Sequence, residues 1–144
     1  MDIITLKNVK KYFGLGPRMV RAVDGVNLTI EKGRFTAVIG SSGSGKTTLL
    51  NLIGGLYRPT EGTVIVDGID LSSLDEDHLT VFRRRKVGFI FQEYNLVPDL
   101  TVRENILFPL ALDNSRADMA FFGRLTELLG LERYLDSFPH MLSG

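Results

Sequence analysis

A chain of 144 residues with 44% hydrophobic and 9% aromatic residues can form one ordinary globular domain with its own core. Its 17 basic and 17 acidic side chains balance, so no net field attracts it to nucleic acid or to an anionic membrane. The absence of cysteine excludes disulfides and thiolate metal sites, and neither a signal peptide nor an apolar segment long enough to cross a bilayer is visible.

Two short strands are expected before residue 35. Ile3, Leu6 and Val9 indicate the first strand, and apolar and polar residues alternate over 26–30 to indicate a second, half-buried one. A Gly-Pro loop separates them. Two strands of this kind predict an antiparallel sheet attached to an α/β core. Tyr12, at the end of the first strand, reads on its own as an edge residue.

Residues 36–48 read as a buried strand, a glycine-rich turn and the start of a helix. Residues 40–47 match the P-loop pattern G-x-x-x-x-G-K-[ST] at every fixed position. A helix start offers unpaired N–H groups and a positive dipole end, and glycines let the backbone approach phosphates closely. Lys46 supplies a charge to the β- and γ-phosphates, and Thr47 supplies a hydroxyl to Mg²⁺. The predicted phosphate-binding residues are Gly40, Ser41, Ser42, Gly43, Ser44, Gly45, Lys46, Thr47 and Thr48.

Turn residues at 58–62 lead into a β-branched strand at 63–66, which Asp67-Gly68 closes as a hairpin-like return. Ser73 and Glu76 have the spacing of a capping box for a short helix that runs to about Arg85. The basic residues 83–86 are then the solvated end of that helix, favoured by its dipole, and carry no functional prediction.

Residues 87–91 form a nearly continuous apolar run that ends in Gln92-Glu93, which is typical of a strand buried on both faces. Polar groups at the carboxyl end of such a strand lie where α/β folds bind ligands, although Gln92 taken alone is as well explained as an ordinary strand-end residue.

The second half of the chain is predicted to be helical. Thr101 and Glu104 form a capping box for a helix that Pro109 should end. A further helix should begin at 113–115 and stop at Gly130, with an apolar face of Phe121, Leu125, Leu128 and Leu129. The last stretch is loop-like, and its His140 is a surface residue with no metal-binding neighbours.

These motifs together resemble the ATP-binding-cassette (ABC) family, and most closely its lipoprotein-releasing and macrolide-export ATPases. Tyr12 falls where the family has an aromatic residue that stacks on adenine, and residues 40–48 match its P-loop. Phe91-Gln92 matches its glutamine loop, and Leu142-Ser143-Gly144 matches the opening of its signature. The order and spacing of the four motifs is far more specific than any one of them.

The resemblance implies roles beyond the P-loop. Gln92 would contact Mg²⁺ and the attacking water and report the nucleotide state to a membrane subunit. Two nucleotide-binding domains would dimerise around ATP, with Ser143 of one facing the γ-phosphate held by the other. The expected catalytic residues are therefore Gln92, Lys46 and Ser143, the expected Mg²⁺ ligands are Thr47 and Gln92, and the cofactors are ATP and Mg²⁺.

The expected fold is an α/β P-loop NTPase core with an antiparallel β subdomain and a helical subdomain, truncated before the second half of the core. Residues 1–95 would form the core with its antiparallel sheet, and residues 96–144 the helical subdomain. The family's Mg²⁺-associated aspartate, catalytic glutamate and switch histidine lie beyond Gly144, so we expect this chain alone to bind nucleotide weakly and to hydrolyse it poorly. Missing central strands should leave apolar side chains exposed at Val38, Ile39, Ile90 and Phe91.

The expected partners are a membrane-spanning transporter subunit and a second nucleotide-binding domain, identical or different, and no nucleic acid. The expected location is the cytoplasmic face of the cell membrane, as a peripheral protein. Two other functions stay open at this point: a nucleotide-binding interaction module of a membrane complex without transport, and a P-loop small-molecule kinase. The transported substrate, the direction of transport and the identity of the membrane partner also stay open.

Overall fold

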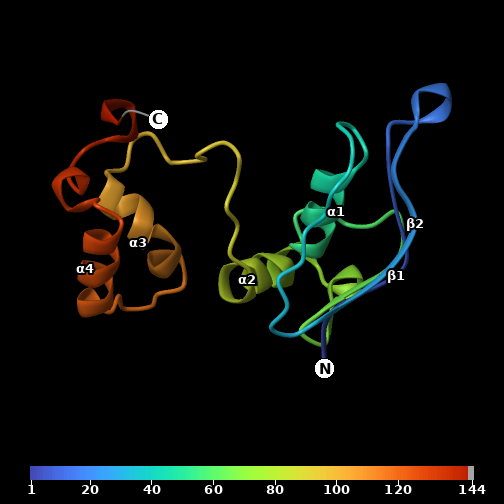
Figure 1. Ribbon diagram of the computed structural model, residues 1–144, viewed down its shortest axis with the longest axis horizontal. Coiled ribbons are helices and arrows are strands. Elements are labelled where there is room, and N and C mark those ends of the chain that lie inside the picture. Colours follow the sequence, from blue (N-terminus) through green and yellow to red (C-terminus); the bar gives the residue numbers. More distant parts are fainter. Residues whose placement is uncertain (143–144) are drawn as a thin grey trace. The chain divides into compact units, whose positions relative to one another are not determined.

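The computed structural model describes residues 1–142 (Figure 1). The chain divides into two compact units, Met1–Phe89 and Ile90–Gly144. The first unit contains strands β1 (Asp2–Phe13), β2 (Val20–Glu31), β3 (Glu61–Val66) and β4 (Ile69–Asp70), with helices α1 (Lys46–Ile53) and α2 (Glu76–Lys86). Short 3₁₀ turns lie at Gly16–Arg18 and Leu71–Ser73. Among residues 1–142, no helix combines the length and the hydrophobicity that crossing a bilayer requires.

The four strands form one antiparallel sheet in the order β2-β1-β3-β4. Leu6 of β1 lies opposite Leu28 of β2 on one side and Val64 of β3 on the other. The register shifts near Asn8, whose φ of 48° is left-handed and whose N–H donates to the side-chain oxygen of Asn27 at 2.9 Å. The predicted antiparallel sheet is therefore confirmed, and its β1–β2 and β3–β4 connections are local in sequence.

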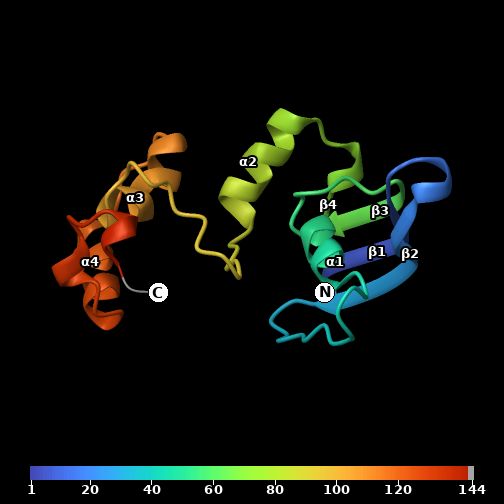
Figure 2. The same cartoon turned by 90° about the horizontal axis from the view of Figure 1, so that it is seen from above.

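Helix α1 packs on one face of this sheet, as Figure 2 shows. Leu52 of α1 is 1% exposed and belongs to one core cluster with residues of the sheet and of α2. The buried members of that cluster are Leu6, Val9, Val23, Leu52, Val64, Val66, Leu71, Leu79 and Phe82. Since the core fixes α1 against the sheet, it also fixes the loop that precedes α1 beside β2.

The strands predicted at residues 36–39 and 87–91 are absent, because neither segment pairs with another strand within residues 1–142. A strand buried on both faces needs hydrogen-bonding neighbours, and its own apolar sequence cannot replace them. The predicted exposure is confirmed for Ile39, Ile90 and Phe91, the first two of which are almost wholly exposed. Val38 is half-buried. Within the first unit, the Phe89 ring packs directly over Gly54 at the end of α1, where an added Cβ would lie 2.0 Å from it.

The cap of α2 also differs from the prediction. Asp75, rather than Ser73, caps the helix, because its carboxylate accepts a hydrogen bond from the His78 N–H at 2.8 Å. That bond lowers the pKa of Asp75. The Ser73 hydroxyl instead donates to the Asp70 carbonyl at 2.8 Å, and Glu76 pairs with Arg58. Aspartate is as good an N-cap as serine, so the capping-box spacing alone predicted the wrong N-cap residue for α2.

The second unit contains helices α3 (Val102–Leu112) and α4 (Met119–Leu128), with 3₁₀ turns at Glu132–Tyr134 and Pro139–Met141. The capping box of Thr101 and Glu104 is confirmed, with the Thr101 N–H donating to the Glu104 carboxylate at 2.7 Å. Pro109 does not end α3, which continues to Leu112. Proline has a helix-compatible φ and removes only one hydrogen bond, and a loss so close to the end of the helix is tolerated.

Helix α4 begins later than predicted, and a different face is buried. Asp118 caps it by accepting from the N–H groups of the next helical turn, and Gly130 follows its end with φ of 67°, as predicted. Phe122 and Thr126 are buried, and Phe122 packs with Val102 and Leu135. The predicted face is wrong at Phe121, Leu128 and Leu129, which are exposed, because the core cluster among the described residues lies on the Phe122 side of the helix.

Candidate functional site

Residues 40–45 form a tight loop that enters α1 beside β2. Gly45, the N-cap of α1, has φ of 85°, in the left-handed region. A Cβ on Gly45 would lie 2.1 Å from the Ala22 carbonyl oxygen of β2, so only glycine fits between the loop and the strand. This close approach sets the position of the loop against the sheet.

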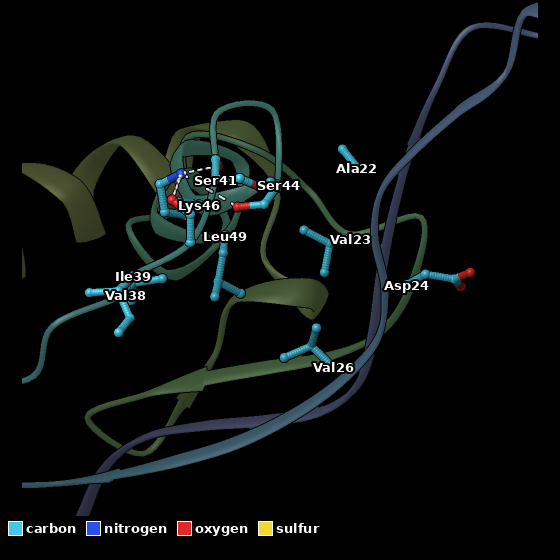
Figure 3. Close-up of a pocket in the computed structure, with 12 residues that line it drawn as sticks. Ala22, Val23, Asp24, Val26, Val38, Ile39, Ser41, Ser44, Lys46 and Leu49 are labelled. Atoms are coloured by element: carbon cyan, nitrogen blue, oxygen red, sulfur yellow. Dashed lines mark hydrogen bonds between the residues drawn. The ribbon is translucent and has the colours of Figure 1, made fainter.

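The Lys46 ammonium group folds back over this loop. It donates to the carbonyl oxygens of Gly40 at 3.0 Å and Ser41 at 2.6 Å, and lies 3.4 Å from the Ser44 hydroxyl (Figure 3). None of these acceptors is a carboxylate, so the positive charge is not neutralised by its hydrogen-bond partners. In the part of the chain that the structure describes, the N–H groups of Lys46, Thr47 and Thr48 have no hydrogen-bond acceptor. A cation and three free N–H donors at the start of a helix favour the binding of an anion there.

Two hollows flank the loop. The larger one, of about 400 Å³, is lined by β2, by residues 38–41 and by α1. Figure 3 shows Val23 and Val26 of β2 pointing toward Leu49 of α1, while Asp24 points to the other side of the strand. The smaller one, of about 230 Å³, lies between residues 20–22 and residues 43–48. The free N–H groups and the Lys46 charge therefore lie next to open space large enough for phosphate groups.

Thr47 is exposed and lines the smaller hollow. Among residues 1–142, no group of three carboxylate or histidine side chains could hold a metal ion by itself. A hydroxyl oxygen is a suitable ligand for Mg²⁺, which in nucleotide sites takes most of its other ligands from phosphates and water. The Thr47 hydroxyl therefore fits a Mg²⁺ that arrives with a nucleotide.

Tyr12 and Phe13, adjacent at the end of β1, point to opposite faces of the sheet. Tyr12 pairs with Arg21 of β2, and its hydroxyl donates to the Asp24 carboxylate at 2.5 Å. That hydrogen bond lowers the pKa of Asp24 and raises the pKa of Tyr12. Phe13 pairs with Val20, which lines the smaller hollow. Cross-strand partners share a face, so Tyr12 goes with Arg21 and Phe13 with Val20. Arg21 and Val20 both line the smaller hollow, so the cross-strand partners of both rings lie beside the P-loop.

Comparison with known proteins decides the family. A family model described as ABC transporter matches residues 23–144. The chain belongs to the ABC transporter family. This membership favours the reading as an ATP-binding component of a transporter over that as a P-loop kinase.

Individual relatives of this ABC chain include exporters and importers. The macrolide export ATP-binding/permease protein MacB of Hyphomonas neptunium is 47% identical over 99% of this chain, which covers 22% of that protein. The methionine import ATP-binding protein MetN of Bifidobacterium longum is 46% identical over 99% of this chain, which covers 36% of it. A dimeric post-hydrolysis structure of the ATP-binding cassette MJ0796 of Methanocaldococcus jannaschii, bound to ADP and Pi, has a TM-score of 0.86 and 42% identity. It matches 97% of this chain and 63% of that one, so the chain spans less than two thirds of each relative.

The other residues implied by the ABC resemblance lie in the second unit. Gln92 is exposed in the irregular segment that precedes α3. Ser143 and Gly144 of the signature lie outside the described residues. Leu142, just before them, packs against the cluster of Val102, Phe122 and Leu135.

Sequence reasoning missed several residues of this ABC site. Val20 and Arg21 were not singled out, although both line the smaller hollow. Ala22 was missed because its backbone oxygen, not its side chain, meets Gly45. No sequence pattern marks a residue for that role.

Proposed function

We propose that this chain binds Mg-ATP at the P-loop and, within the full-length protein, hydrolyses it to drive transport across a membrane. The observation that carries the proposal is the Lys46 ammonium beside the three free N–H groups of the first turn of α1. That arrangement is a phosphate site whatever the rest of the protein does.

The roles of the loop residues follow from their positions. The backbone of residues 40–45 would surround the phosphates, the Lys46 ammonium would pair with the β- and γ-phosphates, and the Thr47 hydroxyl would hold Mg²⁺. Thr48 adds an N–H at the helix start. Gln92 would approach the metal and the attacking water, and Ser143 of a partner domain would face the γ-phosphate.

We place the base on Tyr12, the position that the ABC resemblance implies. Arg21, the cross-strand partner of Tyr12, lines the smaller hollow beside the P-loop, and its guanidinium lies 5.5 Å from the Tyr12 ring centroid. The Tyr12 hydroxyl is held by the Asp24 carboxylate. A base stacked on the Tyr12 ring would add affinity that a bare triphosphate lacks.

Residues 1–144 by themselves should turn ATP over poorly. The only carboxylate among the described residues that line the larger hollow is Asp24, and it points away from Lys46 (Figure 3). A water attacking the γ-phosphate would therefore find no general base there. The proposal assigns hydrolysis to the full-length protein, as a dimer of nucleotide-binding domains on the cytoplasmic face of a membrane with a membrane-spanning subunit.

The test uses the full-length protein with its membrane partner in lipid vesicles. Mg-ATP hydrolysis that is stimulated by the partner and stops in Lys46→Ala would support the proposal. ATP binding with copurification of a membrane protein, but with neither hydrolysis nor solute movement, would favour an interaction module instead. Mg-ATP affinity unchanged in Lys46→Ala would remove the P-loop assignment altogether.

A further inference from the structure

The backbone of Tyr12 lies where the regular pairing of β1 stops. The β1–β2 register shifts on both sides of Lys11, and the β1–β3 pairing ends at Lys10 and Glu61. Irregularities of this kind change the direction in which a side chain leaves its strand. The direction of the Tyr12 ring therefore depends on contacts outside the regular strand pairing.

Thr60, the residue before β3, supplies one such contact. Its hydroxyl accepts a hydrogen bond from the Tyr12 N–H at 3.0 Å, and its own N–H donates to the Lys10 carbonyl oxygen at 2.7 Å. These two bonds hold the backbone from which the Tyr12 ring projects. Thr60 ends the segment that leads from α1 to β3, so it also connects the end of β1 to the helix that begins at the P-loop.

Arg21 supplies a contact to the ring itself, since its guanidinium lies over the Tyr12 ring. The Asp24 carboxylate lies 3.5 Å from the same guanidinium and accepts a hydrogen bond from the Tyr12 hydroxyl. A cation that faces an aromatic ring and pairs with a carboxylate restricts the orientation of that ring. Tyr12 is half-buried, so part of its ring stays open for a base to stack on.

We infer that Thr60 and Arg21 are positioning residues for the Tyr12 ring and thereby set the preference of the site for a nucleotide over bare triphosphate. The inference rests on the proposed function, which places the base on Tyr12. A ring already held in place loses little conformational freedom when a base stacks on it, so its orientation adds to base affinity. Thr60 is not among the described residues that line either hollow beside the P-loop, so its effect should pass through the base and not through the phosphates.

The first experiment compares Mg-ATP with Mg-tripolyphosphate by calorimetry on the full-length protein. Thr60→Val keeps the shape of the side chain but removes the acceptor, and should weaken ATP while leaving tripolyphosphate unchanged. The expected loss is about two- to fivefold, the lower part of the range for one hydrogen bond, because Thr60 is exposed. Thr60→Ser keeps the hydroxyl and should retain ATP affinity.

The same comparison tests Arg21. Arg21→Ala should weaken ATP by about two- to fivefold, the range of one exposed cation–π pair, and should leave tripolyphosphate unchanged. Arg21→Lys keeps a positive charge but not the planar group, so its ATP affinity should lie between those of Arg21→Ala and the parent protein.

The second experiment reads the ring directly. Residues 1–144 contain no tryptophan, so Tyr12→Trp places a fluorescent ring at the stacking position, and the signal is taken as the difference from the parent protein. ATP should change its emission and tripolyphosphate should not. Adding Thr60→Val should lower the fluorescence anisotropy without ligand and reduce the change caused by ATP.

Equal weakening of ATP and tripolyphosphate by Thr60→Val, or no effect on either, would overturn the positioning role of Thr60. The same results in Arg21→Ala would overturn that of Arg21, since equal weakening would mean that its guanidinium contacts phosphate. If Tyr12→Ala left ATP affinity unchanged, the inference would fail while the P-loop assignment stood. If Lys46→Ala left ATP binding intact, the proposed function would fail, and this inference with it.

Discussion

The P-loop and the end of β1 differ in how far their polar groups pair within the chain. In the part of the chain that the structure describes, the N–H groups of Lys46, Thr47 and Thr48 have no acceptor. At the end of β1, Tyr12 and Asp24 hydrogen-bond to each other, and Lys10 pairs with Glu61 at 2.7 Å. Polar groups that satisfy one another stabilise structure, whereas those without partners can bind a ligand. The start of α1 is therefore suited to bind an anion, and the polar groups at the end of β1 stabilise the sheet and the Tyr12 ring.

Lys46→Ala should have the largest effect and bears directly on this difference. The Lys46 ammonium lies over the loop at the start of α1, and charge-assisted hydrogen bonds contribute about 1.5–3 kcal/mol each. Mg-ATP affinity should fall by about a hundredfold or more in calorimetry. Lys10→Ala, which removes the lysine that pairs with Glu61, is the matched control and should leave the affinity unchanged.

Gly45→Ala should have the second largest effect, because the added methyl group pushes the P-loop away from β2. The new Cβ would meet the Ala22 oxygen, and the left-handed backbone alone costs about 1–2 kcal/mol for a residue other than glycine. We expect a loss of about 2–3 kcal/mol of stability in urea unfolding, together with weaker ATP binding. Gly33→Ala has a similar φ of 80° and nothing within 4 Å of its Cβ, so it should show the backbone cost alone. Equal losses in both variants would mean that β2 does not hold the loop.

Tyr12→Ala and Phe13→Ala compare the two adjacent rings at the end of β1. If the base stacks on Tyr12, its removal should weaken ATP by about 1–3 kcal/mol, while tripolyphosphate affinity stays the same. Phe13→Ala should change neither affinity by more than a few tenths of a kcal/mol. The reverse result would move the base to Phe13.

The sequence could predict a feature where the residues that interact are close in the chain. The pairing of β1 with β2 was predictable because these strands follow each other, and the P-loop because its pattern is local. The pairing of β1 with β3 joins residues such as Ile4 and Val66, which no local pattern relates. Residues 36–39 have a comparable apolar pattern, yet they form no strand, since no described segment pairs with them. The edge-to-face contact of Phe13 with Tyr57 could not be predicted either, because it joins residues 44 positions apart that no periodicity relates.

The smallest expected effect concerns the hydrogen bond between Tyr12 and Asp24. Because the bond lowers the pKa of Asp24 below its usual 3.8, its contribution to stability is present above that pH and is lost as the pH falls through the folded-state pKa. Because the same bond raises the pKa of Tyr12 above 10.0, its contribution is present below that pH and is lost as the pH rises through the folded-state pKa. Tyr12→Phe removes the bond at every pH.

The melting temperatures of the parent and of Tyr12→Phe should therefore differ most near neutral pH, and should converge below the folded-state pKa of Asp24 and above that of Tyr12. Both groups are exposed to solvent, so the difference should be small and should shrink further in high salt. At neutral pH, Tyr12→Phe should leave Mg-ATP affinity nearly unchanged, because phenylalanine keeps the ring on which the base would stack. A change in affinity that followed the same pH profile would show that the hydrogen bond to Asp24, and not the ring alone, contributes to the nucleotide site.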